Sequence, residues 1–217
     1  MAFTAQDVKA LREKTGVGMM ECKKALVEAD GDMDKAVDFL RERGLAAAAK
    51  KATRIAAEGV VLPYYDAEAK KGVVVEVNSE TDFVAKNEKF MNFVEGVAKT
   101  ILATDPADVE ALKEEKFDGT DRTVTETLND LVLSIGENMK VRRFERMDGV
   151  VSTYIHGGGS VGVMVGFDVA DESKASAPEF DAMGKNVAMQ IAAMSPAYLD
   201  EASVPAEVVE HEKTILA

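Results

Sequence analysis

An internal repeat with an offset of 90 residues is the feature that most constrains the fold of this chain. When the sequence is aligned on itself at this offset, 15 identical pairs fall between positions 59 and 107 and their counterparts, without a gap. Phe90 falls on Phe180, and Pro106 falls on Pro196. Unrelated segments of this length would share only a few identities. The same supersecondary unit therefore occurs twice, which indicates a duplication.

Each copy of the repeat predicts a β-hairpin followed by a helix. Apolar runs at 60–64 and 73–77 in the first copy, and at 150–155 and 161–167 in the second, flank short turns. The helix after each hairpin shows apolar spacings of three and four residues. Its predicted core face consists of Phe90, Phe93, Val94, Val97 and Ile101 in the first copy, and of Met183, Val187, Ile191 and Met194 in the second.

The segment before the repeat predicts three short helices. Thr4 is suited to cap the first helix, a second runs from about Met19 through Ala29, and Asp32 is suited to cap the third. Gly44 is expected to end the third helix as its C-cap. Residues 45–57, which are rich in Ala and Lys, then predict a separate connecting helix.

These patterns predict an α+β fold in which a helical bundle precedes antiparallel hairpins packed on helices. We expect a helical domain with its linker at 1–54, a first core unit at 55–140 and a second at 141–217. Residues 109–112 and 124–135 predict helices between the two copies, and a last helix is expected to begin near Ala206.

The charge of the chain bears on which partners it can bind. The formal net charge is -13, which disfavours direct binding to nucleic acid or to an anionic membrane. The basic pairs Lys50-Lys51 and Arg142-Arg143 are too small to overcome this charge and are expected to be solvated. No segment has the length and apolarity of a membrane span.

Cys22 is the only cysteine, so no intramolecular disulfide can form. This fits a reducing compartment. The first residues show no basic stretch followed by an apolar run, so no targeting signal is evident, and a cytoplasmic location is expected. The helical setting of Cys22 predicts a half-buried, unreactive residue.

The sequence lacks the residue combinations that catalysis requires, and it predicts a protein that is not an enzyme. His156 and His211 are far apart and have no metal-ligand spacing, so neither a catalytic site nor a metal site is expected. No phosphate-binding loop of the type GxxxxGK[ST] is present, and no cofactor is expected. The run Gly157-Gly158-Gly159 predicts a hairpin turn, because a strand follows it.

Phe83 is the candidate for a surface contact. It lies in the segment 81–87, between a predicted strand and the helix that begins near Glu88. At the offset of 90, Phe83 falls on Ser173, in a polar stretch. If the duplicated framework needed an apolar anchor at this position, the second copy would be expected to have one. The comparison favours an exposed Phe83 over a buried one.

Met19 and Met20 are a second candidate contact. Adjacent residues of a helix cannot both face one narrow core, so we expect one methionine to be buried and the other to be available to a partner. Arg12, on the preceding helix, is expected to lie nearby.

Two long motifs resemble the signatures of the bacterial elongation factor Ts family. Residues 14–26, Lys-Thr-Gly-Val-Gly-Met-Met-Glu-Cys-Lys-Lys-Ala-Leu, are similar to the first, and residues 76–87, Glu-Val-Asn-Ser-Glu-Thr-Asp-Phe-Val-Ala-Lys-Asn, are similar to the second. Residues 154–163 match a third, weaker motif. The resemblance covers essentially the whole chain, and the first two motifs are rarely found outside this family.

The resemblance implies a guanine-nucleotide exchange factor for elongation factor Tu, the GTPase that carries aminoacyl-tRNA to the ribosome. It also implies that the N-terminal bundle is similar to ubiquitin-associated domains. By match of motif, the segment that disturbs the magnesium site of Tu consists of Thr81, Asp82, Phe83 and Val84. The contact of the N-terminal domain with the GTPase domain falls on Arg12, Met19 and Met20. The second core unit is implied to contact Tu through His156, Gly157 and Gly158.

The chain departs from the family pattern in two places. Ser160 stands where the family commonly has a basic residue, which weakens the case for a polar contact from that hairpin. Family members usually continue into a further C-terminal region, so the resemblance leaves open whether residues follow Ala217. Homodimer formation also stays open.

Two other functions remain open from the residues. The first is a non-enzymatic interaction module that binds another partner through its helical bundle. The second is an enzyme, which the missing nucleophile–base pairs and metal ligands disfavour.

Overall fold

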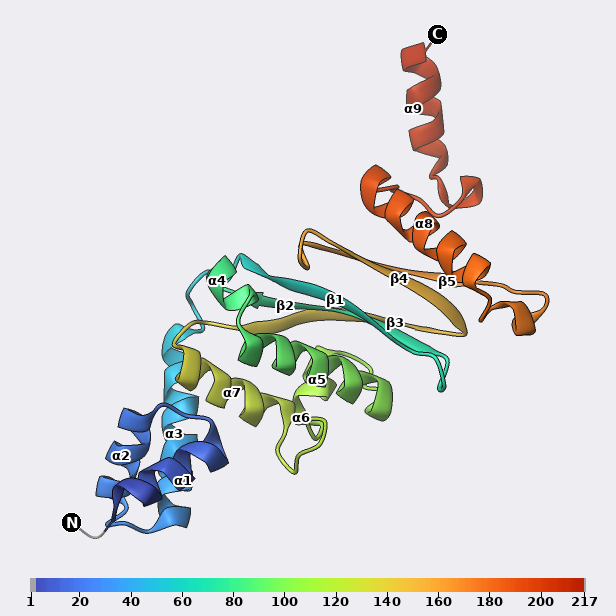
Figure 1. Cartoon of the computed structure of the whole chain (residues 1–217). Coiled ribbons are helices and arrows are strands. Elements are labelled where there is room, and N and C mark those ends of the chain that lie inside the picture. Colours follow the sequence, from blue (N-terminus) through green and yellow to red (C-terminus); the bar gives the residue numbers. More distant parts are fainter. Residues whose placement is uncertain (1–2, 217) are drawn as a thin grey trace.

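The computed structural model describes residues 3–216, without the side chain of Glu172, and it begins with a three-helix bundle (Figure 1). The helices are α1 (Ala5–Thr15), α2 (Met19–Glu28) and α3 (Met33–Lys51). Thr4 and Asp7 form a reciprocal capping box at the start of α1, and Asp32 caps α3. Both predicted caps are confirmed. The bundle core includes Val8, Leu11, Val17, Cys22, Ala25, Leu26, Ala36 and Leu40.

The prediction that Gly44 ends the third helix is wrong. α3 continues through Gly44 to Lys51, because the residues that follow include a run of alanines with high helix propensity. Gly44 is buried, and a Cβ there would lie 3.4 Å from the backbone oxygen of Asn129. The glycine thus permits close packing against a second helix, and the expected connecting helix is largely the second half of α3.

A three-stranded antiparallel sheet follows the bundle. β1 (Glu58–Asp66), β2 (Lys71–Ser79) and β3 (Lys140–Asp148) lie in the order β1-β2-β3. Val60 stands opposite Val77, and Val75 stands opposite Phe144. β3 was not predicted, because charged residues interrupt its apolar pattern. Such residues are common on edge strands, where they oppose pairing with other chains.

Helices cover one face of this sheet. After the single turn α4 (Asp82–Ala85) come α5 (Glu88–Thr104), α6 (Val109–Glu114) and α7 (Val124–Ile135). α5 lies on the sheet, and α7 packs against both α5 and α3 (Figure 1). All five predicted core residues of α5 are buried. The largest apolar cluster of the described residues therefore lies between the sheet and these helices.

The second copy of the repeat forms a smaller layer. β4 (Val150–His156) and β5 (Val161–Phe167) make an antiparallel hairpin, which η1 (Glu172–Lys174) and α8 (Pro178–Met194) follow. At the offset of 90, the first and last residues of α5 correspond to the first and last residues of α8. Asp105 and Ser195, which cap the two helices, are both in the left-handed region. The α+β fold and its repeated hairpin–helix arrangement are confirmed.

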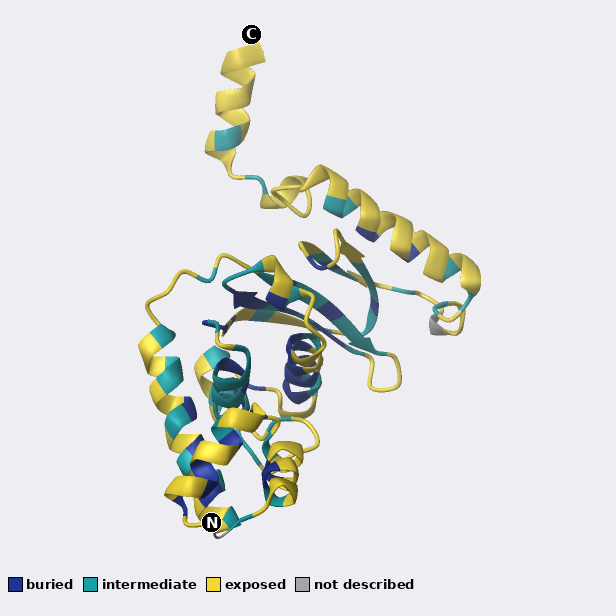
Figure 2. Ribbon diagram, turned by 60° about the vertical axis from the view of Figure 1, so that its left-hand side comes forward, coloured by how far each residue is buried: buried dark blue, intermediate teal, exposed yellow. Residues whose placement is uncertain are grey.

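The predicted core face of α8 is wrong. Met183, Val187 and Met194 are exposed, and the buried residues are Gly184 and Ala188. The cause is the close approach of α8 to its hairpin, where a Cβ at position 184 would collide with the side chain of Ser152. Small residues therefore face the strands. Figure 2 shows the resulting contrast between the exposed α8 and the buried α5.

η2 (Glu201–Ser203) and α9 (Ala206–Leu216) complete the described chain. α9 begins where predicted and projects away from the other elements in both views (Figures 1 and 2), and none of its residues is buried. Among residues 3–216, no helix is long and apolar enough to cross a membrane.

Candidate functional site

The turn α4 presents Phe83 to solvent. Thr81 caps the turn, because its hydroxyl oxygen accepts a hydrogen bond from the backbone N–H of Val84 at 3.4 Å. Val84 is buried in the main core and anchors the turn, whereas Phe83 is 81% exposed. A side chain of this size gains free energy when it leaves water. Phe83 is therefore exposed, as expected, on a turn that the buried Val84 anchors to the core.

Carboxylates from distant parts of the chain fix this turn. The backbone N–H and the hydroxyl of Thr81 both donate to the carboxylate of Glu137, at 3.1 and 2.8 Å. Glu80 accepts from the backbone N–H of Asn138 at 2.5 Å and pairs with Arg54 at 2.9 Å. The segment is thus tied to the end of α7 and to the chain leaving α3. Such bracing reduces the conformational entropy that would be lost if Phe83 were buried by a partner.

Asp82 forms a local charge pair beside the exposed ring. Its carboxylate accepts a hydrogen bond from Nζ of Lys86 at 2.9 Å, one turn further on. This hydrogen bond and the positive charge of Lys86 lower the pKa of Asp82 below its ordinary value. The carboxylate is therefore ionised at neutral pH, and the turn presents an apolar ring next to a negative charge.

The repeat shows what is specific to this turn. At the offset of 90, α4 falls on η1, so a short helical turn follows the hairpin in both copies. In the second copy the counterpart of Phe83 is Ser173, whose hydroxyl bonds to Asp171 at 2.6 Å. The fold keeps the turn without the aromatic side chain.

Both methionines at the start of α2 are exposed. Met19 is 44% exposed and Met20 is 65% exposed, so the prediction that one of them is buried is wrong. The reason is that Val17 folds into the bundle just before α2 begins, where its carbonyl accepts a 3.5 Å contact from Sγ of Cys22. Val17 thus fills the position expected for a methionine. Cys22 is fully buried rather than half-buried, and burial raises the pKa of its thiol.

Arg12, like Met19 and Met20, is exposed on the bundle. Arg12 lies in the last turn of α1, and its carbonyl accepts the capping hydrogen bond of Gly16 at 2.8 Å. Its side chain is exposed. An unbranched, polarizable methionine side chain adapts well to a partner surface, and here both methionines are accessible.

The third candidate region is the turn between β4 and β5. His156 ends β4, and its Nδ1 lies 3.1 Å from the hydroxyl of Tyr154. Gly157 and Gly158 adopt φ values of 60° and 67°, which favour glycine. The predicted hairpin turn is confirmed. Ser160 turns back to donate to the carbonyl of His156 at 3.2 Å, so this hydroxyl stabilises the turn.

This turn reaches the same end of the first sheet as α4. The backbone N–H of Val61 donates to the carbonyl of Gly159 at 2.8 Å, and α4 packs against the same strand, β1. In Figure 1, α4 lies at the end of the first sheet, near the β4–β5 turn. Two of the three candidate regions, on different structural units, thus meet the same strand.

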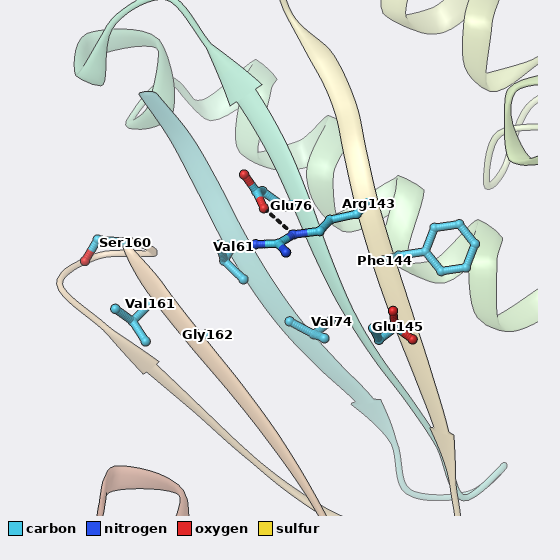
Figure 3. A pocket seen from close by; sticks show the side chains of 9 residues that line it. All are labelled: Val61, Val74, Glu76, Arg143, Phe144, Glu145, Ser160, Val161 and Gly162. Atoms are coloured by element: carbon cyan, nitrogen blue, oxygen red, sulfur yellow. Dashed lines mark hydrogen bonds and ion pairs between the residues drawn. The ribbon is translucent and has the colours of Figure 1, made fainter. Parts of the chain in front are cut away.

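A cavity of about 350 Å³ separates the β4–β5 hairpin from the open face of the first sheet. Figure 3 shows Glu76 and Arg143 on one side, and Ser160, Val161 and Gly162 on the other. Glu76 accepts hydrogen bonds from Arg143 at 2.7 Å and Arg142 at 3.3 Å, so this basic pair is not simply solvated as predicted. These ion pairs join β2 and β3 within the first sheet.

Arg54, Glu80, Glu137 and Asn138 are the supporting residues that the sequence did not reveal. The hydrogen bonds that Glu137 and Glu80 accept span 56 and 58 positions of the chain, and no local pattern signals such pairs. Among the described residues, no group of three or more His, Cys, Asp or Glu side chains is placed to hold a metal ion.

Comparison with known proteins gives a consistent result. The profile of the family described as Elongation factor TS matches residues 80–217. Elongation factor Ts of Clostridium perfringens strain SM101 is 55% identical over 216 residues, which cover 98% of this chain and 70% of that protein. Elongation factor Ts of Syntrophotalea carbinolica is 52% identical over 219 residues, which cover 100% of this chain and 71% of that protein. The chain belongs to the elongation factor Ts family.

Proposed function

We propose that this chain is a guanine-nucleotide exchange factor for the translation GTPase elongation factor Tu. In this proposal it forms a complex with Tu in the cytoplasm, needs no cofactor and catalyses no covalent step. The observation that supports the proposal most is the braced turn α4, which exposes 81% of Phe83 beside the ionised Asp82. Family membership supplies the identity of the partner.

The mechanism acts on the magnesium and phosphate site of Tu. In GTPases, Mg²⁺ bridges phosphate oxygens and a Ser or Thr of the phosphate loop. Insertion of Phe83, with Thr81, Asp82 and Val84 positioning the turn, displaces groups near the metal. Metal and nucleotide are then bound less tightly. By linkage, nucleotide weakens the binding of the factor to the same degree.

Phe83 alone cannot supply the required free energy. A ten-thousand-fold acceleration of GDP release corresponds to about 5.5 kcal/mol, and burying one Phe contributes roughly 1.5–3 kcal/mol. A broad interface, on the order of 1,600 Å², is therefore needed. We assign further contacts to Arg12, Met19 and Met20 on the bundle and to His156, Gly157 and Gly158 on the second hairpin.

This division of contacts corresponds to the domain organisation that we propose. Residues 1–54 form a ubiquitin-associated-like bundle with its linker, 55–140 the first core unit and 141–217 the second. The bundle contacts the GTPase domain, α4 reaches the magnesium site, and the second unit contacts another domain of Tu.

The test is release of fluorescent GDP from purified Tu, followed by stopped flow with and without this chain. With excess unlabelled GDP present to occupy the emptied Tu, we expect an acceleration that increases with the concentration of this chain. An unchanged release rate would overturn the proposal.

A further inference from the structure

Lys89, on the core, forms a hydrogen bond to the N-terminal bundle. Its Nζ donates to the carbonyl of Gly16 at 2.8 Å and to the hydroxyl of Ser134 at 3.2 Å. Ser134 in turn donates to the carbonyl of Gly16 at 3.3 Å. Three segments thus converge here, namely the α1–α2 turn, the start of α5 and the end of α7. We refer to this set of three hydrogen bonds as the latch.

The latch lies next to both predicted contact surfaces. Gly16 caps α1 and precedes Met19 by three residues, and Lys89 lies in the first turn of α5, immediately after α4. The φ of Gly16 is 69°, a conformation that directs the chain from α1 into α2. A hydrogen bond to this carbonyl therefore holds the α1–α2 turn against the helix that follows Phe83.

The bundle and the core do not pack tightly against each other around the latch. A groove of about 420 Å³ lies there, lined by Thr15, Gly16, Lys89, Phe93 and Phe117 among others. α3 packs against α7 beside this groove, Leu133 packs against the bundle core, and Arg41 pairs with Glu126. The α3–α7 contact thus attaches the bundle to the core, and the latch adds polar bonds at the α1–α2 turn.

We propose that Lys89 is a positioning residue that fixes Met19 and Met20 relative to Phe83, so that these exposed side chains contact one partner at the same time. This inference rests on the proposed function. Preorganisation of this kind improves affinity because the free energy of ordering is not lost on binding. Since a hydrogen bond from an exposed charged group contributes modestly, we expect Lys89→Ala to weaken binding to nucleotide-free Tu by roughly two- to tenfold.

Matched variants separate this role from general stability. Lys99→Ala is the control, because Lys99 lies on the same helix and forms a local ion pair with Glu95 at 2.7 Å. It should leave affinity unchanged, and Lys89→Arg, which keeps a donor, should restore most of it. In a Met19→Ala/Met20→Ala background, Lys89→Ala should have no further effect. Additive losses in that cycle would contradict the proposal, because Lys89 would then act independently of the methionines.

Amide hydrogen exchange tests the latch without Tu. The N–H of Cys22, which bonds to the carbonyl of Gly18 at 3.0 Å, reports on the start of α2. Lys89→Ala should accelerate the exchange of this amide, whereas Lys99→Ala should not. Equal exchange rates in wild type and Lys89→Ala would show that the latch does not hold the α1–α2 turn. If wild-type protein fails to release GDP from Tu, the proposed function fails while this exchange measurement still decides whether the latch exists.

Discussion

Phe90 and Phe180 occupy the same position of the internal repeat but differ in their surroundings. Phe90 is fully buried, whereas Phe180 is half-buried and meets Phe167 edge to face at 5.4 Å. α5 is covered on two sides, by the sheet and by α7, while α8 packs mainly on its hairpin. Within residues 3–216, β2 has strands on both sides and β5 pairs only with β4. A repeat therefore preserves the order of the elements without preserving their burial.

The largest contrast is expected from truncating these two aromatic residues. Phe90→Ala should lower the free energy of unfolding by about 3–5 kcal/mol, because it leaves a cavity in the main core. Phe180→Ala should lower it by about 1 kcal/mol, the size of one aromatic contact. Denaturant titration of both variants measures the difference, and equal losses would contradict the contrast between the two units.

A second matched pair compares smaller side chains. Val97 is fully buried and its counterpart Val187 is 36% exposed. Val97→Ala should cost about 2 kcal/mol through lost apolar contacts and the cavity left behind. Val187→Ala should change the stability by less than about 0.5 kcal/mol. A loss at Val187 as large as that at Val97 would show that α8 is covered more fully in solution than in this structure.

The ion pairs of Glu76 with the two arginines of β3 make a smaller, pH-dependent contribution. Burial of Glu76 opposes its ionisation, but hydrogen bonds from Arg143 and Asn78 and the charges of both arginines outweigh this effect and lower its pKa. The stabilisation is therefore present above the ordinary pKa of Glu and is lost as the pH falls through the lowered value. Because the arginines are exposed, Glu76→Gln should cost only about 0.5–1 kcal/mol at pH 7.

Thermal unfolding of wild type and Glu76→Gln measures this pH dependence when it is carried out at neutral pH and at a pH well below the ordinary pKa of Glu. The difference in unfolding temperature between the two proteins should be smaller in acid. A difference in unfolding temperature that does not change with pH would mean that the charge of Glu76 does not stabilise the fold.

The sequence predicted the parts of the fold that depend on local patterns. The repeat and the apolar spacing gave the bounds of α7 and β5 and the buried face of α5. Gly44 and α8 were mispredicted because close packing of helices and strands, rather than periodicity, decides which residues are buried there. β3 was missed because charged residues of an edge strand conceal its alternation.

Only part of the candidate site could be predicted from the sequence. The absence of an aromatic residue at position 173 correctly indicated that Phe83 is exposed. The exposure of both Met19 and Met20 could not be predicted, because it depends on Val17 entering the bundle. The bracing by Glu80 and Glu137, and the latch at Lys89, join segments far apart in the chain and require coordinates.

The central claim is that Phe83 serves exchange rather than folding, and Phe83→Ala tests it most directly. Its GDP release from Tu should be measured by stopped flow beside its unfolding by denaturant, with Ser173→Ala as the matched control in the second unit. We expect release to slow by roughly tenfold or more, from the lost burial of one aromatic ring. The free energy of unfolding should change by less than about 0.5 kcal/mol. An unchanged release rate, or a slowed rate accompanied by a large loss of stability, would contradict the account.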